Sequence, residues 1–383
     1  MDVYGLLAPA IMLMNKLSYA KKFGVISLTF FIPLLLLSYA IINQTYQSIQ
    51  KTVIEQKSLT AIDDLLSIVD QASNYRDIGS VQVILNNKEQ LNSTAEQLES
   101  SLYKNINSFT TKHRGTDVAA EVASKLPAWK KSFARVSENR QTIIADQFKT
   151  YHKVINEILF VANNAAQSSG ISLDTNQNVQ LLLNLVITDY PAYVESLGFA
   201  HSVGVFSIAQ VYLNATVYDT LNDVYDAMDG TIRALNQSHS SLVKENPMFA
   251  KLFSKVFPNV EKDFSDVLSK LDEEVISANS INIKWTEFSD FYHTKMKNIL
   301  TVREVAFTQL DAILESRKNE LTQKLITVAV AIALVMLLIV YLYAAFFWSV
   351  RSTVGEFHDA AHKISAGDMR VRVSVASKDE MGE

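Results

Sequence analysis

Two stretches without a charged residue dominate the hydropathy pattern of this chain, one at residues 24–42 and the other at residues 325–348. A helix rises about 1.5 Å per residue, so about 20 apolar residues cross a hydrocarbon core of about 30 Å. The pattern therefore predicts two membrane-spanning helices. Aromatic rings gather at the carboxyl end of the second stretch, and we expect Trp348 to anchor that end at the level of the lipid headgroups.

Between these stretches, residues 43–324 show the periodicity of helices that pack on one another. Apolar residues recur at spacings of three and four, as in Ile299, Val302, Ala306, Leu310 and Ile313. Stop and cap signals near residues 113–117, 168–175 and 245–247 divide the region into four predicted helices, 44–112, 117–168, 176–244 and 247–324. Weaker breaks are expected near residues 86–87, 229–230 and 258.

These elements predict an all-α fold. The four helices would form a long antiparallel bundle between the membrane helices, either as one tall four-helix bundle or as two bundles stacked end to end. The composition agrees, because 11 glycines and 6 prolines in 383 residues leave few tight turns. The internal breaks favour the stacked arrangement.

Composition argues against several classes of function. The formal net charge is −5 and no region concentrates Lys and Arg, so nucleic acid is not an expected partner. The absence of cysteine excludes disulfides and Cys-ligated zinc. His358 and His362 have a spacing that can bind a metal, but no third ligand lies near them, so we predict no metal site. No phosphate-binding loop or hydrolase motif occurs, and we expect neither a cofactor nor catalysis within these residues.

The distribution of lysines predicts how the chain crosses the membrane. Lys16, Lys21 and Lys22 precede the first apolar stretch, and the next basic residue is Lys51. The positive-inside rule then keeps residues 1–23 in the cytoplasm as a leader, which begins at either Met1 or Met14, and exports residues 43–324. The second span returns the chain, so both termini are expected to be cytoplasmic. A cleaved signal peptide is the less favoured alternative, because the apolar run is longer than a usual signal core.

Residues 349–383 carry the most specific pattern in the chain. Four parts follow one another: a heptad seam of Val354, Phe357, Ala361 and Ile364, a turn at Gly367 and Asp368, an extended connector at 369–373, and the helix start Asp379-Glu380-Met381-Gly382. This order resembles a HAMP domain, of which the sequence holds the first helix, the connector and the opening of the second helix. The resemblance implies that Met381 caps the core and that Glu380 sets the entry of the second helix. Ser352 stands where that family often has proline.

The heptad seam also predicts an oligomer. A helix with one apolar face cannot bury that face alone, so the seam needs a second helix and a partner chain. We therefore expect a parallel homodimer.

The whole plan resembles a bacterial transmembrane chemoreceptor of the methyl-accepting type, in the inner membrane. The wider class of sensors with helical periplasmic domains includes receptor histidine kinases and diguanylate cyclases, and the stretches 74–78, 171–174 and 190–193 are similar to that class. Where relatives tend to show Arg-Gly-Leu-Gly, this chain has His201-Ser202-Val203-Gly204. The resemblance implies a chemotaxis receptor that signals to cytoplasmic partners through an output domain beyond residue 383. The alternatives are the sensor portion of a kinase or cyclase, and an anchored coiled coil without a ligand.

One charged residue interrupts the apolar stripe of the first exported helix. Following Ile62, Leu65, Val69 and Ala72 by threes and fours leads to Arg76, and then to Gly79. A buried guanidinium is never deprotonated and costs several kcal/mol unless it is paired. Tyr190 and Tyr193 also lie on an inward stripe, so these three residues predict a site for a small organic anion. The alternatives are an internal ion pair with a carboxylate from a neighbouring helix, and a side chain that reaches out to solvent.

Overall fold

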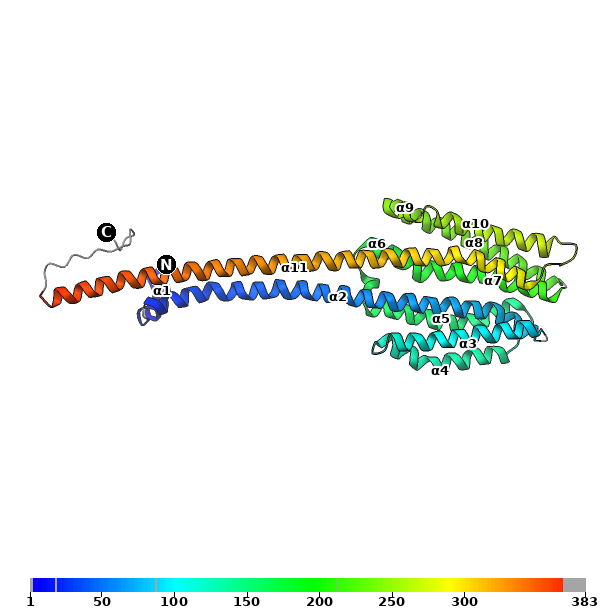
Figure 1. The fold of residues 1–383 in the computed structure, drawn as a ribbon, viewed down its shortest axis with the longest axis horizontal. Coiled ribbons are helices and arrows are strands. Elements are labelled where there is room, and N and C mark those ends of the chain that lie inside the picture. Colours follow the sequence, from blue (N-terminus) through cyan, green and yellow to red (C-terminus); the bar gives the residue numbers. More distant parts are fainter. Residues whose placement is uncertain (1–2, 18, 87, 212, 368–383) are drawn as a thin grey trace. The chain divides into compact units, whose positions relative to one another are not determined.

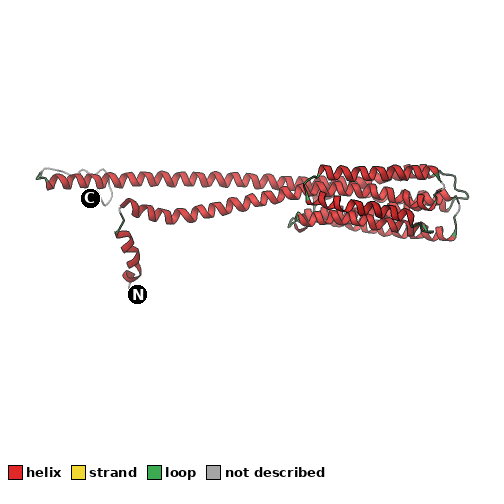
Figure 2. Ribbon diagram, turned by 90° about the horizontal axis from the view of Figure 1, so that it is seen from below, coloured by secondary structure: helices red, strands yellow, loops and turns green. Residues whose placement is uncertain are grey.

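The computed structural model describes residues 3–17, 19–86, 88–211 and 213–367 (Figure 1). Helices make up this part of the chain almost entirely, and it contains no strand, so the fold is all-α as predicted (Figure 2). The chain divides into two compact units. Residues 51–317 form one, and residues 1–50 and 318–383 form the other. We call the first the helical domain and describe each unit by itself.

The helical domain is a set of antiparallel helices joined by short turns. In chain order these are the second part of α2 (Tyr19–Ile84), α3 (Glu89–Lys112), α4 (Asp117–Glu138), α5 (Ile144–Ser168), a single turn η1 (Ile171–Leu173), α6 (Gln177–Asn184), the π turn η2 (Leu185–Asp189), α7 (Tyr190–Gln210), α8 (Ala215–Glu245), α9 (Pro247–Phe253), α10 (Val256–Leu271), the π turn η3 (Asp272–Ile276) and the first part of α11 (Trp285–Ser365).

Side-chain contacts place α2 at the centre of this set. On α11, Tyr292, Arg303 and Arg317 contact Asp77, Asp70 and Glu55 of α2, so the two helices run antiparallel. Contacts of Ser58 with Ala165 and of Tyr75 with Tyr151 place α5 against α2 in the same sense. Helix α3 lies on a further face of α2, through Gln71 and Asn105. The core of the domain therefore forms around α2.

The predicted helix lengths are wrong, because each of the four predicted helices divides into two or more. The chain reverses not only at the predicted stops but also at residues 85–88, 139–143, 211–214 and 277–284. The break expected near residues 86–87 is thus a reversal, whereas α8 continues through residues 229–230 and α10 continues through residue 258. Both predicted bundles, the tall one and the stacked one, needed helices that run through these reversals. The observed helices are half as long and lie side by side (Figures 1 and 2).

Two of the missed turns lack the strongest turn signals, glycine and proline. Residues 139–143 and 211–214 contain neither glycine nor proline. Val211 adopts a φ of 64°, in the left-handed region where glycine is the usual residue. A β-branched residue pays a steric cost there, so packing of the flanking helices fixes this turn against local preference.

The other unit consists of α1 (Val3–Asn15), the first part of α2 and the second part of α11. Helices α2 and α11 are both long and apolar enough to cross a membrane. Many of their apolar side chains are exposed in a single chain. Phe30 is 75% exposed and Leu337 is 66% exposed. Helix α11 continues to Ser365 and ends before Gly367, whose φ of 96° takes the left-handed conformation typical of helix ends.

Candidate functional site

Three clusters of buried and partly buried side chains in the helical domain are each built around one arginine, Arg76, Arg303 or Arg317, and we name the clusters after these residues. All three join α2 to another helix, and two of the arginines lie on α11. Arginine stays charged in any protein environment, so each cluster must supply a matching carboxylate.

The Arg76 cluster is the most deeply buried of the three. Arg76 and Asp77 are 1% and 0% exposed, and Arg76 Nε donates to Asp77 Oδ1 at 3.0 Å. Tyr292 Oη donates to the other carboxylate oxygen at 3.2 Å, and His201 Nδ1 lies 3.5 Å from it. Burial alone would raise the pKa of Asp77, but the charge of Arg76 and the neighbouring His201 ring hold it below its usual value. The carboxylate therefore stays ionised inside the domain.

Rings and a glycine complete this cluster. The Arg76 guanidinium lies over the Phe148 ring at 4.1 Å, and the His201 ring stacks on Tyr292 with centroids 3.8 Å apart. Gly198 of α7 leaves the space that the ion pair occupies. A Cβ atom at residue 198 would lie 2.5 Å from Arg76 Nη2 and 2.8 Å from both Asp77 oxygens.

The Arg303 cluster joins α2, α7 and α11. Arg303 contacts Asp70, and its Nε lies 3.3 Å from Asp63 Oδ1. Tyr190 Oη donates to Asp70 at 2.5 Å. Burial raises the pKa of Asp70 to about 6, although Arg303 and Tyr190 both oppose the rise.

The Arg317 cluster lies where α11 leaves the helical domain. Arg317 makes two hydrogen bonds to Asp174, of 2.7 and 3.0 Å, and a third of 3.3 Å to Glu55. Asp174 follows η1, in the turn between α5 and α6. Burial and the nearby Asp174 raise the pKa of Glu55. One guanidinium thus ties α2, α11 and this turn together, and it neutralises two carboxylates that would otherwise repel each other.

Two adjoining cavities open beside α5, the first between α2, α5 and the segment η2–α7 and the second between α5, η1, α6 and η2. The first, of about 320 Å³, is lined by apolar side chains together with polar ones that include Arg76, His152, Asn156, Thr188 and Glu195. The second, of about 420 Å³, is lined largely by amides and hydroxyls, and the two share Asn163, Ile187 and Thr188. We call the first the α5–α7 cleft. A third cavity, of about 380 Å³, lies between α2 and α11 beside Arg303.

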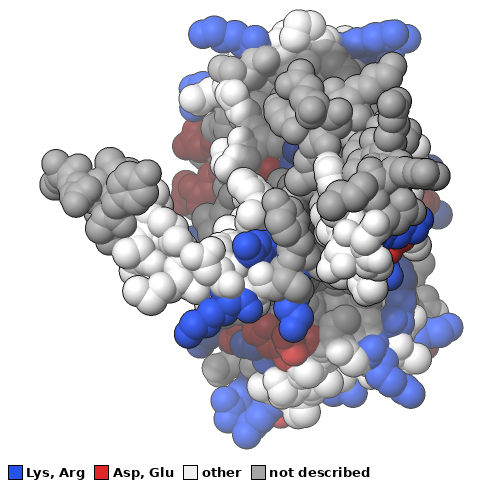
Figure 3. Space-filling model, turned by 90° about the vertical axis from the view of Figure 1, so that its left-hand side faces the viewer, with Lys and Arg blue, Asp and Glu red and all other residues white. Residues whose placement is uncertain are grey.

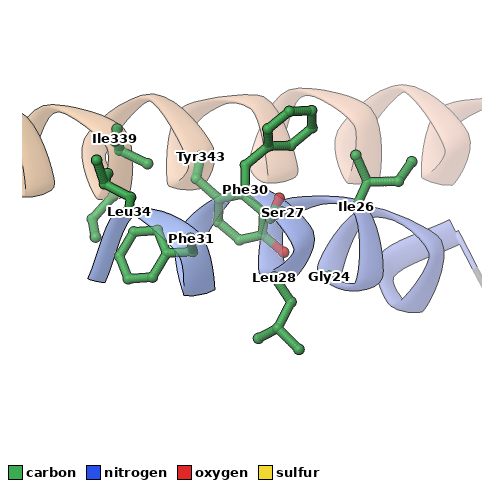
Figure 4. A pocket seen from close by; sticks show the side chains of 10 residues that line it. Gly24, Ile26, Ser27, Leu28, Phe30, Phe31, Leu34, Ile339 and Tyr343 are labelled. Carbon is green, nitrogen blue, oxygen red and sulfur yellow. The ribbon is translucent and has the colours of Figure 1, made fainter. Parts of the chain in front are cut away.

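A larger cavity, of about 530 Å³, lies in the other unit and has a different character. It is lined by apolar side chains of the two predicted membrane spans, with hydroxyls only from Ser27 and Tyr343 (Figure 4). Such a surface suits lipid chains or another apolar helix and offers no partner for a charged ligand.

The structure separates the three residues predicted to bind an anion. Arg76 belongs to its own cluster, Tyr190 belongs to the Arg303 cluster, and Tyr193 is 1% exposed and does not line the described cavities near Arg76. Arg76 is matched by a carboxylate, as in the alternative of an internal ion pair, but that carboxylate is its own neighbour Asp77 rather than a residue of another helix. The anion site at these residues stays a prediction.

The predicted HAMP residues fall partly within the described part of the chain. Val354, Phe357 and Ile364 are 45%, 42% and 45% exposed, and Ala361 is exposed as well. Glu380 and Met381 lie outside the described residues. Trp348 is 66% exposed, and the Arg351 guanidinium lies 5.9 Å from its ring.

No metal centre is evident in the described ranges. The rings of His358 and His362 are 6.4 Å apart, and no group of three potential ligands occurs among these residues. Lys and Arg side chains are spread over the visible face rather than gathered into one patch (Figure 3).

Sequence reasoning missed most members of the three clusters. Asp77 adjoins Arg76 in the chain, so it could have been predicted as the carboxylate that pairs with this arginine. Arg303 stands between seam residues Val302 and Ala306, so its inward position could have been inferred from the periodicity. Gly198, His201 and Asp174 carry no comparable signal, because their roles depend on which helices become neighbours.

No protein-family model matches this chain, and no curated protein or solved structure matches it either.

A substitution at Gly198 tests the packing of the Arg76 cluster. We expect Gly198→Ala to destabilise the helical domain by about 1–3 kcal/mol, because the new methyl group displaces a buried ion pair that cannot move freely. Gly230→Ala is the matched control; a Cβ there meets nothing within 4 Å, so the gain in helix propensity should leave stability unchanged or raised. Thermal unfolding of both variants, followed by circular dichroism in detergent, makes the comparison. Equal stability of Gly198→Ala and the unsubstituted chain would contradict the tight packing described here.

Proposed function

We propose that this chain is the sensory and transmembrane part of a two-pass receptor of the bacterial inner membrane, of the methyl-accepting chemotaxis type. The observation that carries the proposal is α11, a single helix of 81 residues. In order along this helix lie Arg303 and Arg317 of the buried clusters, the charge-free stretch 325–348, and the apolar seam that begins at Val354. In this proposal one continuous helix carries residues of the ligand-responsive interior in its first part and the output surface in its last part.

Transmission follows from the mechanical properties of such a helix. The backbone hydrogen bonds of an α-helix resist stretching, so a displacement of α11 inside the helical domain is carried along its axis. The Arg317 cluster restrains α11 against α2 at the edge of the domain. A ligand that changes the packing of α2, α7 and α11 would strengthen or weaken the Arg317 contacts between α11 and α2. Packed interfaces respond to such a change by moving between discrete arrangements.

The resemblance of residues 349–383 to a HAMP domain gives the output side. The exposed seam residues Val354, Phe357 and Ile364 are then the surface through which two copies of α11 associate, and an output domain beyond residue 383 reads that association. The two copies form a parallel homodimer, which closed twofold symmetry favours for one self-complementary surface. We assign no reaction to residues 1–383. In the alternative of a kinase or cyclase sensor, the output domain would carry the reaction.

The topology is tested by labelling single cysteines in intact cells. We expect Ser101→Cys, exposed on α3, to react with a membrane-impermeant maleimide, and Ser365→Cys, exposed near the end of α11, to react only after the cells are opened. The lysines before residue 24 and the two spans give this expectation. Reaction of Ser365→Cys in intact cells would overturn the cytoplasmic placement of the seam.

The homodimer is tested by oxidative crosslinking in membranes at low expression. We expect Phe357→Cys and Ile364→Cys to form disulfide-linked dimers several-fold faster than His358→Cys and Lys363→Cys, their neighbours off the seam. All four positions lie on the same exposed helix, so accessibility alone predicts equal rates. Equal crosslinking at all four would count against association through the seam.

A further inference from the structure

The α5–α7 cleft is framed by a break in helix geometry. The π turn at 185–189 ends at Tyr190, whose N–H donates to the Leu185 carbonyl, one residue further back than in an α-helix. Pro191 follows directly and has no N–H to continue the α-helical ladder. Ile187, Thr188, Pro191 and Ala192 from this wide turn line the cleft opposite α5. Single π turns inside helices occur often at functional sites, since they shift side chains away from regular helical register.

The charges around this cleft do not cancel. Arg76 contributes to the lining, but Asp77 already neutralises it, and its Nη2 points toward Gly198 on the α7 backbone. Glu195 is the other charged lining residue. Its Oε1 lies 3.0 Å from His152 Nδ1, but burial lowers the pKa of His152 below its usual value despite the opposing charge of Glu195, and the charge of Arg76 lowers it further, so a second positive charge on this imidazole is disfavoured. Among the described residues, no lysine or arginine forms an ion pair with Glu195.

The neutral polar groups of the cleft add further acceptors. Asn163 uses its amide N–H on the Leu159 carbonyl, at 3.2 Å, which leaves its side-chain oxygen to accept. Thr188 and Ser73 contribute hydroxyls, and Val69, Ile155 and Leu159 give the cleft an apolar wall. A volume of about 320 Å³ is at the lower end of the range for ligand pockets, so the occupant is small.

From this arrangement we propose that the α5–α7 cleft binds a small protonated organic amine, with its ammonium group at Glu195 and its methylenes along the apolar wall. A second polar group on the ligand reaches the adjoining amide-lined cavity through the shared residues Asn163 and Thr188. Charge decides the class: a carboxylate ligand would face Glu195 and find an arginine that Asp77 already neutralises. Arg76 lines the cleft and pairs with Asp77, which accepts a hydrogen bond from Tyr292 of α11, so an occupant of the cleft reaches α11 through these residues. The inference rests on the proposed receptor function for its role, but the site itself is defined by these residues alone.

Three probes of one length separate charge from shape. 4-Aminobutan-1-ol carries an ammonium group, 1,4-butanediol is its neutral counterpart, and 4-hydroxybutyrate is its anionic counterpart. Binding of each to the full chain in nanodiscs is measured by isothermal titration calorimetry at pH 7. We expect saturable binding of the amine and at least tenfold weaker binding of the diol and the acid. Preference for 4-hydroxybutyrate, equal binding of the amine and the diol, or no binding of the amine would overturn the assignment.

Substitutions then locate the site. Glu195→Gln keeps size and hydrogen bonding but removes the charge, and we expect it to weaken amine binding at least tenfold. Glu157→Gln, on α5 outside the cleft lining, is the matched control and should bind as the unsubstituted chain does. Circular dichroism melting curves check that both variants are folded. Amine binding that survives Glu195→Gln unchanged would place the ligand elsewhere. Neither outcome bears on membrane topology or on the seam, so failure of this proposal is distinguishable from failure of the proposed receptor function.

Discussion

Matching buried arginines with carboxylates is the constraint on which the helical domain depends. A guanidinium cannot shed its charge when it is desolvated, so each of Arg76, Arg303 and Arg317 forces one or more carboxylates to a defined place. Asp77, Asp70 and Asp63 come from α2, and Asp174 comes from the turn after η1. Apolar contacts would tolerate small slips of one helix along another, whereas the pairs made by Arg303 and Arg317 fix the register of α2 against α11.

This constraint also links the interior to the proposed signal. Buried ion pairs add little net stability, but breaking one by moving a partner costs several kcal/mol, so they favour a few discrete arrangements over a continuum. The Arg76 cluster adjoins the α5–α7 cleft, and the Arg317 cluster lies at the edge of the domain on the same helix as Arg303. In the proposed receptor, α11 would therefore carry a ligand-dependent change from one cluster to the others.

The sequence predicts elements well where a local pattern determines them. The all-α class, the two charge-free stretches and the stops near residues 113–117, 168–175 and 245–247 follow from periodicity and capping, which are properties of neighbouring residues. The reversals at 139–143 and 211–214 were not predicted, because neither segment contains glycine or proline. Val211 shows this most directly, since it adopts a left-handed conformation that its own side chain disfavours.

In the candidate site, too, a local pattern predicts some features, and the packing of distant helices decides the rest. The inward position of Arg76 follows from a stripe of apolar residues on one helix, and the structure buries it. Its surroundings do not follow, because Gly198, His201 and Tyr292 reach it from α7 and α11, more than 120 residues away in the chain. The charge balance of the α5–α7 cleft likewise depends on the contact between His152 of α5 and Glu195 of α7. The residue spacing within either helix does not predict that contact.

A double-mutant cycle on Arg317 and Asp174 tests charge matching most directly. In the unsubstituted chain Asp174→Asn removes the main partner of the half-buried Arg317 guanidinium and should lower the melting temperature. In an Arg317→Met background two buried carboxylates, Asp174 and Glu55, face each other with only the exposed Lys51, 3.7 Å from Glu55, as a nearby cation, so the same Asp174→Asn change should raise the melting temperature. Thermal unfolding of the four proteins in detergent gives the coupling energy. The account predicts this reversal of sign; a loss of stability in both backgrounds would contradict it.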